Sequence, residues 1–236
     1  MQIYLRGVEV SATRVVDVRR FGIVGAVVVA LVVVAAAAAA GSGWSVQPTP
    51  NPPAGGILSA VSCASARACT AVGYRGRAED ASLAERWNGT RWSIQRLPGG
   101  ISHIPVDVSC TSAGACTAVG YSFNRHGVYV VLAWRWNGSK WSSERIPNPA
   151  HGGGVPSGVS CWSANACTAV GSDDRGFTLA ERWNGSRWLI QQTLRRPGGG
   201  PTGAALLGVS CKSAHTCIAV GGNFNHWKTL AERWIG

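Results

Sequence analysis

Apolar and polar residues alternate in short stretches along most of the chain. In the first such region the stretches are "AVSC", "CTAVG", "LAERW" and "RWSIQ", joined by short polar links. Alternation over four to eight residues predicts half-buried β-strands, and the apolar residues show no helical spacing. Asn88-Gly89, between the third and fourth stretches, is typical of a tight hairpin turn. The pattern therefore predicts four short antiparallel strands.

This pattern occurs four times. Its first cysteines are Cys63, Cys110, Cys161 and Cys211, which gives periods of 47, 51 and 50 residues. Four antiparallel strands in a unit of about 40–50 residues are typical of a β-propeller blade. We expect one unit in each of four segments, about 57–97, 107–147, 157–197 and 207–236.

The segment before the first unit resembles the end of a unit. "GSGWSVQPTPNPP" aligns with "GTRWSIQRLPGG", and the fourth unit has no fourth strand after "LAERWIG". Pairing of Trp44–Gln47 with Leu230–Trp234 would complete the last blade and remove exposed strand edges. We predict an all-β, four-bladed propeller over 41–236, closed by residues 43–49. A linear β array and an assembly in which another chain supplies the missing strand are the alternatives.

Residues 1–40 follow a different pattern. Phe21–Ala40 is a stretch of twenty residues without a charge, and four arginines and two acidic residues precede it. A positive start, an apolar core and small residues at the end predict an apolar helix that acts as a secretory signal. The length also fits an uncleaved membrane anchor, in which residues 21–40 would be the membrane contact. Both interpretations place the repeats outside the cell or on the outer face of the cytoplasmic membrane.

The charge balance favours an anionic partner. The chain has 22 basic and 11 acidic residues, and those outside residues 1–40 leave a net charge of +9. A basic surface attracts wall polymers, acidic polysaccharides or lipid head groups, although solubility alone also explains a net charge. No run of five like charges concentrates the positive charge, and we do not expect nucleic acid as the partner.

The cysteines predict disulfides. All eight lie in Cys-x5-Cys pairs, one in each unit, and an even count in an exported chain favours disulfide bonds. Zinc ligands usually have tighter spacing, so we predict no metal site and no cofactor. The expected bridges, each between the first and second strands of a unit, are Cys63/Cys69, Cys110/Cys116, Cys161/Cys167 and Cys211/Cys217.

Most tryptophans recur in register around the Asn-Gly turns, which predicts a role in packing between blades. These are Trp44, Trp87, Trp92, Trp136, Trp141, Trp183, Trp188 and Trp234. Trp134, Trp162 and Trp227 fall outside the register and are candidates for sugar or partner contacts, or plain surface residues. The repeated pairs Glu85-Arg86, Glu181-Arg182 and Glu232-Arg233 are expected to be structural or exposed ion pairs.

The links between second and third strands differ from unit to unit, and they share one face with the interblade linkers. Their sequences are "YRGRAED", "YSFNRHGVYV", "SDDRG" and "GNFNHWK". Such variation indicates either drift or a specialised binding face. Aromatic and cationic groups around a central funnel suit an anionic or sugar ligand. The candidate ligand-binding residues are Tyr74, Arg75, Arg77, Phe123, Arg125, His126, Asp173, Asp174, Arg175, Phe224, His226 and Trp227.

The motif "VSCxSAxxCTAVG…LAERWNGxxW" resembles secreted actinobacterial-type β-propeller repeat proteins, some of which carry sialidase-like labels. The resemblance implies a propeller and an exported location, but no reaction. Trp87 stands where the sialidase Asp-box has its aspartate. We therefore expect a monomeric, non-enzymatic binding or scaffold module for an anionic polymer, glycan or protein partner.

A glycoside hydrolase or lyase is the alternative function. Such enzymes usually need two carboxylates that face each other across a cleft. The candidates outside the repeated glutamates are Glu79, Asp80, Asp107, Glu144, Asp173 and Asp174.

Overall fold

The computed structural model describes residues 43–76, 81–100, 102–150, 152–193 and 203–236. These residues form fifteen β-strands and no helix, and so none that is long and apolar enough to cross a membrane. The predicted apolar helix of residues 21–40 lies outside the described part. The chain divides into two compact units, Met1–Ser45 and Val46–Gly236, and all strands belong to the second.

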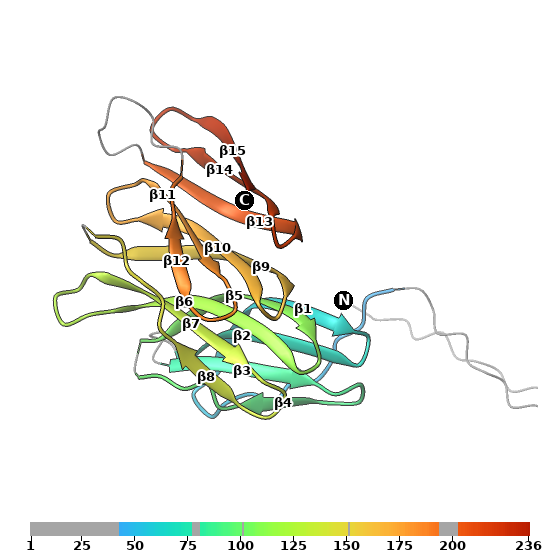
Figure 1. Ribbon diagram of the computed structural model, residues 1–236. Coiled ribbons are helices and arrows are strands. Elements are labelled where there is room, and N and C mark those ends of the chain that lie inside the picture. The colour runs from blue at the N-terminus through green and yellow to red at the C-terminus, as the bar shows by residue number, and fades with distance from the viewer. Residues whose placement is uncertain (1–42, 77–80, 101, 151, 194–202) are drawn as a thin grey trace, which may run out of the picture. The chain divides into compact units, whose positions relative to one another are not determined.

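The strands form four antiparallel sheets in chain order, each with the up-and-down arrangement of a propeller blade (Figure 1). Blade 1 contains β1 (Gly56–Ser65), β2 (Ala68–Arg75), β3 (Ala81–Trp87) and β4 (Trp92–Gln95). Blade 2 contains β5 (Ile104–Ser112), β6 (Ala115–Phe123), β7 (Tyr129–Trp136) and β8 (Trp141–Glu144). Blade 3 contains β9 (Gly154–Ser163), β10 (Ala166–Asp173), β11 (Thr178–Trp183) and β12 (Trp188–Gln191). Blade 4 contains β13 (Ala204–Ser213), β14 (Thr216–Asn223) and β15 (Lys228–Ile235). The predicted all-β repeats are thereby confirmed.

The first two strands of every blade are joined by a disulfide, as predicted. Cys63 pairs directly with Cys69 across β1 and β2, and their Cα atoms lie 3.9 Å apart. The same bridge recurs as Cys110–Cys116, Cys161–Cys167 and Cys211–Cys217. Each bridge closes the hairpin at the end where the chain turns from the first strand into the second.

A β-bulge in the first strand of each blade explains the glycine of the repeated "AVG". In blade 2 the pairing shifts between Pro105 and Asp107, and Gly120 lies opposite this irregularity. A Cβ atom on Gly120 would overlap the Ile104 carbonyl oxygen and come within 2.7 Å of Pro105 Cα. Equivalent shifts occur in the other three blades. The bulge therefore requires glycine because the two backbones approach so closely.

Successive blades pack through contacts that recur at each interface. The amide of Cys110 in blade 2 donates a hydrogen bond of 2.9 Å to Ser62 Oγ in blade 1. The Arg86 guanidinium lies 4.4 Å from the centre of the Trp136 ring, and its Nη2 donates to the Ala113 carbonyl. We call the surface that carries Ser62 and Arg86 the forward face of a blade, and the surface that receives them the backward face.

The apolar core lies between the blades. Trp136 and Trp141 are buried in the cluster between blades 1 and 2, and Trp183 and Trp188 in the cluster between blades 2 and 3. These four confirm the predicted packing role. Trp87, Trp92 and Trp234 are half-buried, and Trp44 is fully exposed, so the prediction was wrong for Trp44.

The predicted closing strand is absent from the described residues. Blade 4 has three strands, β15 pairs with β14 alone, and Gly43–Pro53 forms no strand. Residues 47–50 instead line a hollow with Trp87 and Trp92 on blade 1. "PTPNPP" aligns with the linker "RIPNPA" that crosses between blades 2 and 3. Its prolines cannot donate ladder hydrogen bonds, so the segment runs across blade 1 as a linker.

Two further predictions need correction. Trp134 is 1% exposed and its Nε1 donates to the Pro98 carbonyl, so it is a core residue and no surface contact. Glu85 and Arg86 form no ion pair, because neighbouring strand residues point to opposite faces of the sheet. Glu85 is buried, whereas Arg86 reaches blade 2.

Candidate functional site

The variable loops and the interblade linkers share one end of the blades. The amides of Gly76, Asp174 and Phe224 donate to the carbonyls of Gly55, Gly153 and Gly203, at the approach to the first strand of the same blade. The Ala204 amide also donates to Gly176 in the preceding blade. We call this end the loop end, and the end with the Asn-Gly turns the turn end.

The loop end carries the predicted ligand-binding residues in four successive groups. The group in blade 1 is Tyr74 and Arg75, at the end of β2. The groups in blades 2, 3 and 4 are Phe123, Arg125 and His126; Asp173, Asp174 and Arg175; and Phe224, His226 and Trp227. All are exposed except Tyr74 and Asp173, which are half-buried, and Trp227 is 92% exposed. Arg77 lies outside the described residues.

An Asn or Asp side chain closes each of three loops. Asp173 Oδ1 accepts hydrogen bonds from the Arg175 and Phe177 amides. Asn124 and Asn223 accept equivalent bonds in blades 2 and 4. Asp173 therefore has the turn-forming role expected of Asx residues, which weakens its case as a catalytic carboxylate.

The other candidate carboxylates have separate positions. Glu79 and Asp80 lie outside the described residues, and Glu144 ends the outer strand β8. Asp107 lies on the inner strand β5, where its two oxygens accept from the Val108 and Val159 amides at 2.8 and 2.7 Å. Burial raises the pKa of Asp107, and the two amide bonds partly oppose that rise. Asp107 thus joins blades 2 and 3.

Replacement of Asp107 should therefore weaken the fold. Asp107→Ala leaves the Val159 amide without its acceptor, and we expect the free energy of unfolding to fall by about 1–3 kcal/mol. Urea denaturation followed by tryptophan fluorescence measures this, with Asp174→Ala in the exposed loop as the control. An equal effect of the two substitutions would contradict the role given to Asp107.

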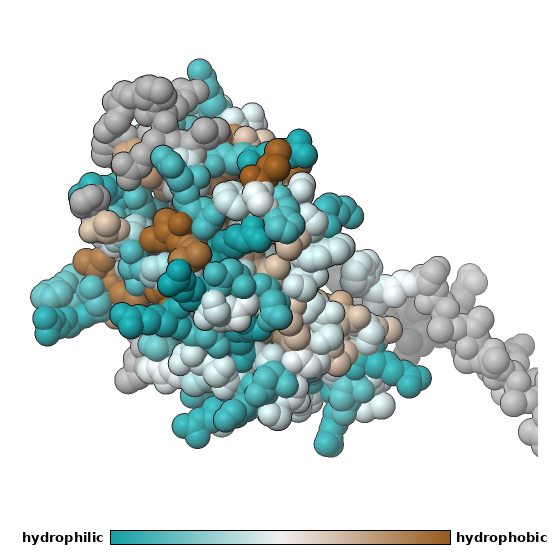
Figure 2. All heavy atoms as spheres, in the orientation of Figure 1, coloured by the Kyte–Doolittle hydropathy of each residue, from teal (hydrophilic) through white to brown (hydrophobic). Residues whose placement is uncertain are grey.

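Two equivalent pockets open at the loop end of blades 1 and 3. The blade 1 pocket has a volume of about 560 Å³ and is lined by Pro52, Pro53, Arg75, Ser82, Leu83, Ile94, Gln95, Arg96 and Leu97. The blade 3 pocket, of about 470 Å³, is lined by Pro149, Ala150, Asp173, Arg175, Phe177, Thr178, Leu179, Ile190, Gln191, Gln192 and Thr193. Each combines an arginine, a hydroxyl, a glutamine and an apolar Leu/Ile surface. Figure 2 shows an apolar patch over β12, whose exposed apolar residues are Leu189 and Ile190.

The two pockets differ in charge. Arg75 and Arg96 both line the blade 1 pocket, and no carboxylate lines it among the described residues. In the blade 3 pocket Asp173 accompanies Arg175. The blade 1 pocket therefore suits a carboxylate or another anion, because an arginine fork donates paired hydrogen bonds to such groups. The blade 3 pocket suits a neutral polar group.

The variable loops pointed to Arg75 and Arg175, but Arg96 and the other lining residues of the two pockets were not predicted. Ser82 and Gln95, like Thr178 and Gln191, lie on the third and fourth strands of their blades, outside the variable loops that contain the predicted residues. Arg96 follows directly on the fourth strand, outside the variable loops. The equivalent residues in blades 2 and 3 are Arg145 and Gln192, so the sequence does not distinguish Arg96 from Arg145.

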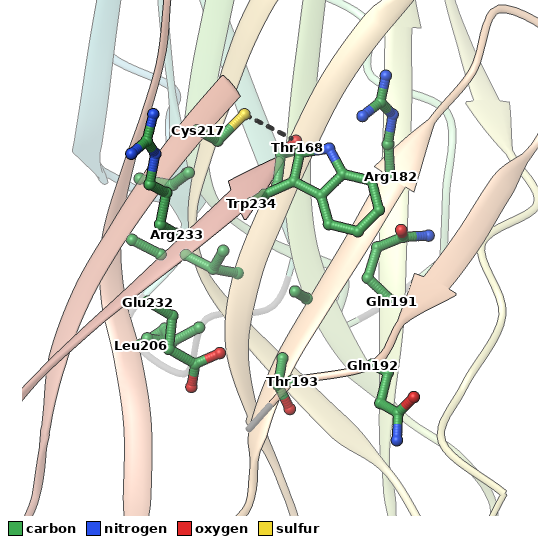
Figure 3. A pocket seen from close by; sticks show the side chains of 14 residues that line it. Thr168, Arg182, Gln191, Gln192, Thr193, Leu206, Cys217, Glu232, Arg233 and Trp234 are labelled. Atoms are coloured by element: carbon green, nitrogen blue, oxygen red, sulfur yellow. Dashed lines mark hydrogen bonds between the residues drawn. The ribbon is translucent and has the colours of Figure 1, made fainter. Parts of the chain in front are cut away.

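A third hollow lies between blades 3 and 4 and has a volume of about 60 Å³ (Figure 3). Thr168, Arg182, Leu206 and Trp234 are among its lining residues. The Arg182 guanidinium lies 5.4 Å from the Trp234 ring centre, compared with 4.4 Å at the two preceding interfaces. This hollow is a packing gap too small for a sugar ring.

Comparisons with known proteins found likenesses in structure only. No protein-family model matches the chain, and no curated protein sequence matches it. YCF48 bound to D1 peptide is 13% identical over 71% of this chain and 47% of that one, with a TM-score of 0.44. SapL1 lectin in complex with alpha methyl fucoside is 11% identical over 76% of both chains, with a TM-score of 0.40. A mutant Aleuria aurantia lectin in complex with Fucalpha1-6GlcNAc is 7% identical over 72% of this chain and 58% of that one, with a TM-score of 0.45. The chain therefore spans about half the length of YCF48.

Proposed function

We propose that this chain is a non-enzymatic binding module that holds an acidic polysaccharide at its loop end, outside the cell. The observation that carries the proposal is the pair of equivalent pockets on blades 1 and 3, each lined by an arginine and by apolar Leu and Ile side chains. Four disulfides support an oxidising compartment. A net charge of +9 outside residues 1–40 favours a polyanion.

The blade 1 pocket is the proposed primary contact. Arg75 and Arg96 bind a sugar carboxylate, Ser82 and Gln95 hydrogen-bond to ring hydroxyls, and Leu83 and Ile94 contact the apolar face of the ring. The side chains of Arg75 and Arg96 have no hydrogen-bond partner among the described residues, so binding disrupts no existing bond there. The blade 3 pocket, where Asp173 accompanies Arg175, holds a second sugar of the same polymer more weakly.

The proposal is tested with polygalacturonate as the acidic probe and dextran as the neutral probe. In biolayer interferometry with immobilised probe, the full chain should bind polygalacturonate and not dextran. Arg75→Glu/Arg96→Glu should raise the Kd at least about tenfold, the loss of roughly one charge-assisted contact. Binding of dextran with the same Kd would contradict the proposal.

Lys140→Glu/Arg187→Glu is the matched control. It makes the same change in net charge on exposed residues beside two Asn-Gly turns, at the turn end. We expect a change in Kd of less than about threefold, because only long-range attraction is lost. If this variant loses as much affinity as the pocket variant, general charge attraction explains the binding and the pocket does not.

A further inference from the structure

The forward face of blade 4 has the form of an interface without a partner. Ser210, Ile218 and Arg233 stand where blade 1 has Ser62, Thr70 and Arg86. Val220 is 51% exposed, whereas its equivalent in blade 1, Val72, is 0% exposed. Ile218 is 49% exposed although it replaces a threonine that is buried in the first three blades. In Figure 3 the Arg233 side chain lies on the opposite side of Trp234 from Arg182.

The backward face of blade 1 has exposed residues where the backward faces of blades 2 and 3 are covered by the preceding blade. In blade 2 the Ala113 carbonyl accepts bonds from both Trp136 Nε1 and Arg86. In blade 1 the equivalent Ala66 carbonyl accepts from Trp87 Nε1, and no arginine reaches it among the described residues. Val61 is 61% exposed, whereas its equivalents Val108 and Val159 are 4% and 6% exposed.

We propose that blade 4 of one copy of this chain packs on blade 1 of a second copy, head to tail. Three contacts of the internal interfaces would recur: Arg233 over Trp87, Arg233 Nη donating to the Ala66 carbonyl, and the Cys63 amide donating to Ser210 Oγ. The internal amide bonds to serine measure 2.9, 3.0 and 3.0 Å, so one packing geometry already occurs three times in each copy.

The second copy also supplies a fourth strand beside the three described strands of blade 4. Each linker that crosses a backward face follows the fourth strand of the preceding blade, as Leu97 and Pro98 follow β4. Residues 47–50 lie in this linker position on blade 1. Trp44–Gln47 of the second copy therefore arrives beside β15 of the first, whose outer edge pairs with no described strand. A partner copy thus completes the blade, in the manner of β-strand addition.

A second copy fits better than closure within one chain. Extensive packing between described blades joins 1 to 2, 2 to 3 and 3 to 4, and blade 4 does not pack in this way on blade 1. Because the two open faces differ, the contact is heterologous and forms a ring or an open chain of copies. A blade face that contacts only solvent would be expected to be polar, and the exposed Ile218 and Val220 on the forward face of blade 4 are apolar.

The proposal predicts complementation between two variants of the full chain. Arg233→Glu alters one open face and Val61→Asp the other, and each is expected to raise the dissociation constant at least about tenfold. Native mass spectrometry should show a dimer or larger assembly for the parent chain and monomers for each variant. A mixture of the two, one labelled with nitrogen-15, should form a one-to-one heterodimer, because one intact forward face and one intact backward face remain.

Arg187→Glu, an exposed substitution of the same charge at the turn end, is the matched control and should leave the assembly unchanged. The proposal is overturned by a monomeric parent chain at about 100 μM, or by two variants that fail to combine while circular dichroism shows them folded. It is also overturned if the assembly persists unchanged in Arg233→Glu.

A photo-cross-linker at Trp87 should capture residues 229–236 of the differently labelled copy, and capture only within one copy would show closure of the single chain instead.

Discussion

Gly120→Ala is expected to lower the free energy of unfolding by at least about 3 kcal/mol. The added Cβ would overlap the Ile104 carbonyl oxygen, and the backbone there cannot retreat because it belongs to the bulge opposite Gly120. Gly120 is buried between its neighbouring strands. Both strands must therefore shift, and the contacts of β5 with the adjacent blades shift with them.

Thermal unfolding of the disulfide-intact chain measures the effect. A loss of this size lowers the Tm by about 6–12 °C in a domain of about 200 residues. Gly208→Ala is the matched control, since Gly208 lies in the equivalent first strand of blade 4 and its Cβ would meet nothing closer than 4.0 Å. Equal shifts for the two substitutions would contradict the explanation of the repeated glycine by the bulge.

Glu181→Gln is expected to stabilise the chain increasingly as the pH rises. Glu181 is 1% exposed between blades, and its Oε1 has no hydrogen-bond partner. Burial without a cationic partner raises the pKa of Glu181 to about 8. Glu232 of blade 4, the equivalent of Glu181, accepts a hydrogen bond from the Thr178 hydroxyl of blade 3. In blade 2, which precedes Glu181, the position of Thr178 is occupied by valine, which offers no such donor.

The direction of the pH dependence follows from the difference in proton binding between the folded and unfolded chains. A carboxyl with a raised pKa holds its proton in the folded state up to about pH 8, whereas the unfolded carboxyl loses it near pH 4.3. The stabilisation is therefore complete below about pH 4 and is lost as the pH rises towards 8. Glutamine has no charge to bury. The free energy of unfolding of the variant, relative to that of the parent chain, should therefore rise by on the order of 3 kcal/mol between pH 4.5 and 8.

Urea denaturation of both chains across that pH range measures the difference. Glu144→Gln, a half-buried substitution on β8, controls for the loss of one negative charge. A difference between parent and Glu181→Gln that stays constant with pH would show that Glu181 is ionised in the folded chain and would refute the effect of burial.

The sequence predicted the blades well because each signal was local and repeated. The alternation, the Asn-Gly turns and the Cys-x5-Cys pairs each depend on residues close in the chain, and the structure confirms all three. The closing strand failed because pairing of Trp44–Gln47 depends on where the last blade lies. That position is set by the angle between successive blades, which a one-dimensional pattern does not contain.

The candidate site was predicted only in part, for a related physical reason. Variation along the repeats pointed to Arg75 and Arg175, which do line pockets. It missed Ser82 and Gln95, because these residues lie on strands and not in the variable loops. Trp134 shows the converse, since its departure from the repeat reflects a buried hydrogen bond to Pro98 rather than a surface contact. The unlike directions of Glu85 and Arg86 follow from strand geometry and were predictable.

Hydrogen exchange of the full chain with and without polygalacturonate tests the central claim most directly, because it locates the ligand on the molecule. We predict slower exchange at residues 74–76 and 94–97 around the blade 1 pocket, and a smaller change at 173–177 around the blade 3 pocket. Exchange at the Asn-Gly turns 137–140 and 184–187 should stay unchanged. Protection confined to those turns, or no protection at the loop end under saturating polymer, would contradict the account.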